Sequence, residues 1–183
     1  MEKTKIQVNM DNFPKELHSY LEGTQIYDSS CRSTAKVYYI STGYYLKVDA
    51  KRKLEREVFM ADWFYKKGLG AKMIQYITTD QDYMLTKAAE GEDCLSDLNH
   101  PEKLCELLAE TMRTLHSMPI FDVPKSVAFE NFLAALENGK GDYCESVLMP
   151  RFMVSSKEEA WEIMQANKHR LKCDTLIHGD FCL

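Results

Sequence analysis

The sequence predicts an α+β protein in two parts, a mainly β part over residues 1–87 and a helical part over residues 94–183. Two observations predict this division. Short runs of β-branched and aromatic residues fill the first part around one helical segment, whereas apolar residues in the second part recur at helical spacing. The composition changes between them, over residues 88–93, and we interpret this segment as a linker.

Five short β-rich runs in the first part predict an antiparallel sheet of about five strands. The expected strands cover residues 24–28, 35–40, 44–49, 73–78 and 83–86. Residues 41–43, Ser-Thr-Gly, are a tight connection, so the second and third strands are expected to form a hairpin. The polar residues 79–82, Thr-Asp-Gln-Asp, are expected to form the turn between the last two strands.

Two helices are expected to accompany this sheet. The first covers residues 13–22, with Pro14 in its first turn and Gly23 at its end. The second covers residues 51–67, after the third strand, because its apolar residues form one stripe with charges opposite. Gly68 begins the Gly-Leu-Gly segment that ends it.

The second part is predicted to be helical. Residues 101–117 have the spacing of a strongly amphipathic helix, and residues 129–137 are predicted to form a shorter one. Ser156 and Glu159 form a capping box, which predicts a helix from there to about Arg170.

The end of the sequence carries the motif with the clearest chemistry. An apolar run at residues 175–177 leads into His178-Gly179-Asp180, and we expect a strand followed by a turn that presents the carboxylate. Kinases need this arrangement, because a hydroxyl nucleophile must meet a positioned Asp while the phosphoryl group is held in line.

Composition and charge narrow the class of protein. A hydrophobic fraction of 45% and a charged fraction of 28% are typical of globular domains. The net charge of −5 argues against a nucleic-acid partner and suits a cationic small molecule. The six cysteines form no CxxC pair, and no signal peptide or membrane span is visible. We therefore expect a cytoplasmic protein with reduced thiols and no membrane partner.

The chain resembles the aminoglycoside 3′-phosphotransferases of bacterial antibiotic resistance, which share the bilobal protein-kinase-like fold. The residues that carry the resemblance, in order, lie at 33–38, 45–47, 54–57, 89–91, 115–117 and 178–180. The resemblance covers almost the whole chain from Phe13 onward. It implies a complete N-terminal nucleotide-binding lobe over residues 1–87, a hinge over 88–93, and a partial helical C-terminal lobe that ends in the catalytic loop.

The resemblance implies ATP or GTP as the phosphate donor and an aminoglycoside as the cationic substrate. Lys47 would contact the α- and β-phosphates, and Glu57 would pair with Lys47. A lone ammonium is a flexible point charge, and a carboxylate on a packed helix fixes its position. Ser33 matches the phosphate contact of the family, in a loop whose small residues let backbone N–H groups approach an anion.

The remaining implied residues lie at the hinge and in the catalytic loop. Lys87 and Ala89 match the lobe connection, whose backbone receives the adenine. Asp180 would be the general base or would orient the acceptor hydroxyl.

The family holds Mg²⁺ with an Asn and an Asp that follow the catalytic loop. The sequence ends at Leu183, before either position, so we expect the Mg²⁺ ligands beyond the C-terminus. We expect the 183-residue chain itself to be a truncated and inactive form, because the phosphate charge would not be neutralised.

Two alternatives remain open from the sequence. The chain could be a nucleotide-binding module without catalysis, or a small-molecule kinase of the same fold that acts on choline, homoserine or a sugar.

Overall fold

The computed structural model describes residues 3–31, 34–91, 98–123, 153–170 and 175–176. The chain divides into two compact units, residues 1–92 and 93–183. No helix among the described residues is both long enough and apolar enough to cross a membrane.

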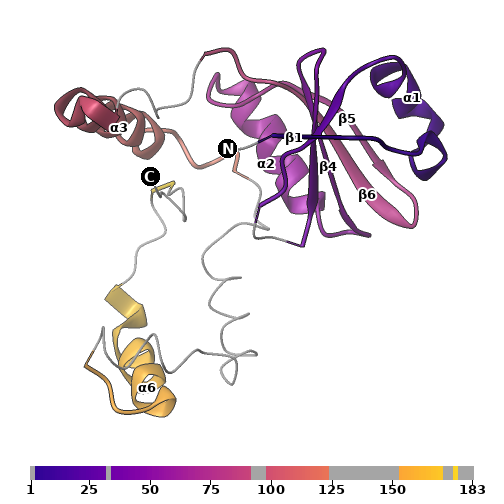
Figure 1. Ribbon diagram of the computed structural model, residues 1–183. Coiled ribbons are helices and arrows are strands. Elements are labelled where there is room, and N and C mark those ends of the chain that lie inside the picture. Colours follow the sequence, from indigo (N-terminus) through magenta and orange to yellow (C-terminus); the bar gives the residue numbers. More distant parts are fainter. Residues whose placement is uncertain (1–2, 32–33, 92–97, 124–152, 171–174, 177–183) are drawn as a thin grey trace. The chain divides into compact units, whose positions relative to one another are not determined.

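The described part of the first unit contains a six-stranded antiparallel sheet in the order β1-β2-β3-β4-β6-β5 (Figure 1). The strands are β1 (Thr4–Ile6), β2 (Ile26–Asp28), β3 (Lys36–Ile40), β4 (Tyr44–Ala50), β5 (Met73–Thr78) and β6 (Gln81–Lys87). This arrangement confirms the predicted α+β class and the hairpin of β3 and β4. The predicted count of five strands was too low. Strand β1, at the edge of the sheet, has only three residues and is too short to give a periodic signal in the sequence.

The two helices of this unit cover opposite faces of the sheet. Helix α1 (Lys15–Leu21) packs on the face to which Leu46 and Val48 of β4 point, and its apolar side chains share one core with them. Lys47 lies between those two residues in the strand, so its side chain points to the other face. Helix α2 (Glu55–Lys66) lies on that second face, where it contacts β5.

Several sequence-based boundaries in this unit were wrong. Helix α1 begins at Lys15, because Pro14 is its N-cap and not part of its first turn, and β2 begins at Ile26. The helix predicted over 51–67 begins only at Glu55, because Arg52 has φ 66, a left-handed conformation that an α-helix cannot include. The turn predicted over 79–82 is shorter, because β6 begins at Gln81. Asp82 is therefore a strand residue, and its side chain is completely buried.

The second unit confirms two predicted helices. Helix α3 (Pro101–His116) begins with its proline in the first turn. Helix α6 (Lys157–Asn167) has the predicted cap, since the Ser156 Oγ accepts a hydrogen bond from the Glu159 N–H, and a 3-10 turn, η4 (Lys168–Arg170), follows it. The helix predicted over 129–137 lies outside the described residues. The two described residues of the run at 175–177 are not in a strand.

Candidate functional site

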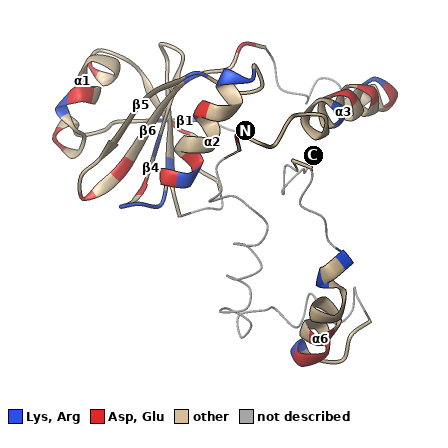
Figure 2. Cartoon of the chain, turned by 180° about the vertical axis from the view of Figure 1, so that it is seen from behind, with Lys and Arg blue, Asp and Glu red and all other residues tan. Residues whose placement is uncertain are grey.

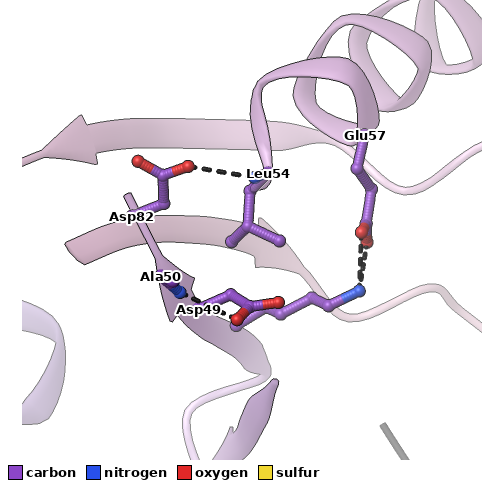
Figure 3. A network of polar contacts seen from close by, with 6 residues as sticks. Asp49, Ala50, Leu54, Glu57 and Asp82 are labelled. Carbon is purple, nitrogen blue, oxygen red and sulfur yellow. Dashed lines mark hydrogen bonds and ion pairs between the residues drawn. The ribbon is translucent and has the colours of Figure 1, made fainter. Parts of the chain in front are cut away.

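The predicted pair of Lys47 and Glu57 is in direct contact. The Lys47 Nζ donates hydrogen bonds to the Glu57 Oε1 at 2.8 Å and Oε2 at 2.6 Å, and Figure 3 draws these bonds as dashed lines at the labelled Glu57. The two side chains are 26% and 44% exposed, so the ion pair adds little to the stability of the fold. Its effect is positional, because a carboxylate that accepts two bonds fixes an otherwise flexible ammonium. An ammonium has three N–H groups, which leaves one for an anionic ligand.

The sheet and α2 together determine this geometry. Lys47 lies near the middle of β4, between Val37 of β3 and Met84 of β6, so strands on both sides hold its backbone. Glu57 lies in the first turn of α2. Figure 2 shows acidic and basic residues together along this helix. A lysine on a central strand and a glutamate on a packed helix therefore meet with little backbone freedom.

The predicted hinge residues begin where β6 ends. The Lys87 N–H donates to the Lys72 carbonyl at 2.9 Å, and the Ala88 N–H donates to the Gly43 carbonyl at 2.8 Å. Ala89 is exposed. The start of the linker is thus fixed to the sheet by its backbone, while the side chains of Lys87 and Ala89 face solvent.

Two predicted site residues, Ser33 and Asp180, lie outside the described residues. The described part of the loop before Ser33 is closed by local hydrogen bonds. The Ser30 N–H donates to the Asp28 Oδ1, and hydrogen bonds from Ser30 lower the pKa of the Asp28 carboxyl below its usual range. The Val37 N–H donates to the Ser30 Oγ at 2.9 Å, which joins the loop to the start of β3.

A row of tyrosines, none of them among the predicted site residues, lies on the same face of the sheet as Lys47. Tyr27, Tyr39 and Tyr45 are neighbours across β2, β3 and β4, with ring centroids 6.1 Å and 5.1 Å apart. The Lys3 Nζ lies 3.6 Å from the Tyr39 ring centre. Tyr45 precedes Lys47 by two residues, so strand alternation was a signal that could have identified it.

Asp82 also lies on this face and was not among the predicted site residues. Burial would raise the pKa of its carboxyl, but hydrogen bonds from the backbone of Leu54 and Arg52 bring the pKa below its usual value. No sequence signal marked it, since an Asp in a polar run is usually a turn residue.

Comparison with known proteins gives two matches. The chain is 37% identical over 185 residues to a probable aminoglycoside 3′-phosphotransferase of Lactococcus lactis subsp. lactis, which covers 98% of this chain and 71% of that protein. It is 33% identical over 122 residues to an aminoglycoside 3′-phosphotransferase of Staphylococcus aureus, covering 60% of this chain and 46% of that protein. No family model matches the chain.

Proposed function

The chain belongs to the aminoglycoside 3′-phosphotransferase family, and from this premise we propose that it binds ATP or GTP through Lys47 for phosphate transfer to an aminoglycoside hydroxyl. The observation that carries the proposal is the bidentate contact between Lys47 and Glu57. A fixed ammonium neutralises phosphate charge without first losing the freedom of a long side chain. The fit of this pair to a phosphate group supports a nucleotide here.

Tyr45 offers a surface for the nucleobase. It pairs in register with Thr86, the residue before Lys87, so its ring lies beside the start of the linker. Aromatic side chains stack on bases of any sequence. A base on Tyr45 would reach the linker backbone at Lys87 and Ala89, while its phosphates extend along β4 toward Lys47.

Two further roles follow from the family. We assign Ser33 to the phosphate contact and Asp180 to the acceptor hydroxyl, as the general base or as the group that orients it. The net charge of −5 suits an aminoglycoside, which is a polycation.

The family also implies Mg²⁺, which would neutralise charge on the phosphates when bound. Among the described residues no three His, Cys, Asp or Glu side chains come together. None of the described side chains is assigned to the ion, and no step of the proposal passes through it.

Nucleotide binding is tested by titrating the chain with ATP and with GTP in a calorimeter, with and without Mg²⁺. Saturable binding of either nucleotide supports the proposal, and no binding of both contradicts it. The acceptor is tested by following the γ-phosphate of radiolabelled ATP in the presence of aminoglycosides, choline, homoserine and sugars. Labelling of a compound outside the aminoglycosides would contradict the proposed substrate.

Replacing Glu57 by glutamine should weaken ATP binding about fivefold, because Lys47 keeps a neutral acceptor but loses the carboxylate that fixes it, a difference of about 1 kcal/mol. Calorimetric titration measures the change. Glu55→Gln is the matched control, since Glu55 lies in the same helical turn, pairs only loosely with Arg52 at 3.8 Å, and should bind ATP as the wild type does. Equal effects of the two substitutions would show that Lys47 does not depend on Glu57.

Replacing Tyr45 by alanine should weaken binding of both ATP and adenosine by about fivefold, at the lower end of the range for base–aromatic stacking. Tyr45→Phe should bind like the wild type, because stacking needs only the ring. Tyr44→Ala is the control, since Tyr44 points to the opposite face and packs against Tyr20 of α1. Weakened ATP binding with unchanged adenosine binding would contradict a base on Tyr45.

A further inference from the structure

A buried carboxylate lies beside the start of α2. Asp82 of β6 is 0% exposed, and its Oδ2 accepts a hydrogen bond from the Leu54 N–H at 2.9 Å (Figure 3). The two residues are 28 positions apart in the sequence. An ionised group is costly to bury unless its partners compensate, so this contact is a built feature of the fold.

The contact replaces a missing helix cap. Helices usually begin after a Ser, Thr, Asp or Asn whose side chain accepts a bond from the first turn. The N-cap residue of α2 is Leu54, which makes no such side-chain bond. Asp82 supplies an acceptor from the neighbouring sheet instead, and its negative charge lies at the end of the helix where the dipole is positive.

The carboxylate binds Leu54, the residue that directly follows the turn between β4 and the helix. Arg52 has φ 66, which a residue with a side chain adopts only under constraint. The Lys53 N–H donates to the Ala50 carbonyl at 3.0 Å, which closes the turn after β4. Burial alone would raise the pKa of the Asp82 carboxyl, but hydrogen bonds, first from the Leu54 backbone, bring the pKa below its usual value, which favours the charged form.

The anchored segment leads directly to Glu57. The Val58 N–H donates to the Leu54 carbonyl at 2.8 Å, so Glu57 lies within the first hydrogen-bonded turn after the anchor. The strand that carries Asp82 pairs with the strand that carries Lys47, with Asp49 opposite Asp82. Both members of the ion pair are therefore held by two adjacent strands of one sheet, Lys47 directly and Glu57 through α2.

We propose that Asp82 is a positioning residue for nucleotide binding, which anchors the start of α2 to β6 and so keeps Glu57 on the Lys47 ammonium. This inference rests on the proposed nucleotide-binding function. It assigns Asp82 no contact with the nucleotide, and its whole effect passes through Glu57.

The test is a double-mutant cycle on ATP affinity, measured by calorimetry on the whole chain. Asp82→Ala should weaken ATP binding about fivefold, like loss of the Glu57 charge. In a Glu57→Gln background the same substitution should change the affinity by less than about twofold, because the charged partner through which Asp82 acts is already absent. Asp82→Asn keeps an acceptor for the Leu54 N–H and should restore most of the affinity.

Two controls distinguish a general loss of stability from a specific effect on ATP binding. Ile40→Val removes buried volume on the α1 face and should leave ATP affinity unchanged. If Asp82→Ala does not fold, Asp82→Ser takes its place in the double-mutant cycle, because serine is polar but too short to reach the Leu54 N–H. Unchanged ATP affinity in Asp82→Ala, or an equal loss with and without the Glu57 charge, would overturn the inference.

A second readout needs no nucleotide. The acetylation rate of the Lys47 amine, measured by mass spectrometry against the Lys36 amine, should rise in Asp82→Ala and in Glu57→Gln, with no further rise in the double variant. A wild-type chain that fails to bind ATP would overturn the proposed function, while this rate would still decide whether Asp82 acts on the ion pair. No change in the rate would then contradict the inference itself.

Discussion

Replacing Lys47 by methionine is expected to weaken ATP binding by about tenfold to a hundredfold, the range for loss of a hydrogen bond to a charged group. Methionine keeps much of the length of the side chain but removes the ammonium and all its donors. The Glu57 carboxylate then also has no cation beside it and would repel the phosphates. Calorimetric titration of the variant with ATP measures the loss.

The matched control is Lys36→Met. Lys36 is an exposed lysine on β3, and it pairs with Val48, whose side chain points to the α1 face. This variant removes the same charge from the same sheet and should bind ATP as the wild type does. Equal losses in both variants would show that only the overall charge of the sheet matters.

Replacing the neighbouring Leu46 by alanine is expected to lower the free energy of unfolding of the first unit by about 2–5 kcal/mol, the usual cost of emptying a buried leucine site. Leu46 is 0% exposed and lies in the core with Leu17 and Leu21 of α1. Urea unfolding followed by circular dichroism measures the change.

Leu46 and Lys47, adjacent in β4, should therefore give opposite results: Leu46→Ala lowers stability, whereas Lys47→Met lowers ATP affinity. Lys47→Met should leave the urea midpoint nearly unchanged, because its ion pair is partly exposed. Leu69→Ala is a second control, since Leu69 is an exposed leucine and surface substitutions usually change stability by less than about 0.5 kcal/mol. A small effect of Leu46→Ala would contradict the packing of α1 on this face.

The parts of the fold with a local signal could be predicted from the sequence. The hairpin around Gly43 and the amphipathic helix at Pro101 follow from short-range patterns, and the structure confirms both. The contact between Lys47 and Glu57 was predicted from the family resemblance, and it forms because a central strand and a packed helix hold its two members.

What the sequence did not reveal depends on contacts between distant segments. Strand β1 is defined by pairing with β2, because three edge residues carry no period of their own. Asp82 looks like a turn residue in a polar run, and its hydrogen bond with the backbone N–H of Leu54, 28 positions away, cannot be read from a local pattern. The start of α2 was misplaced because no local pattern marked the left-handed residue Arg52, after which the helix begins only at Glu55.

The most direct test of the central claim compares ATP with adenosine in the wild type and in Lys47→Met. If the ammonium held by Glu57 binds the phosphates, the wild type should prefer ATP and the variant should lose that preference, while both bind adenosine equally. A Lys47→Met protein that still prefers ATP over adenosine by the wild-type factor would contradict the claim that the Lys47 ammonium binds the phosphates.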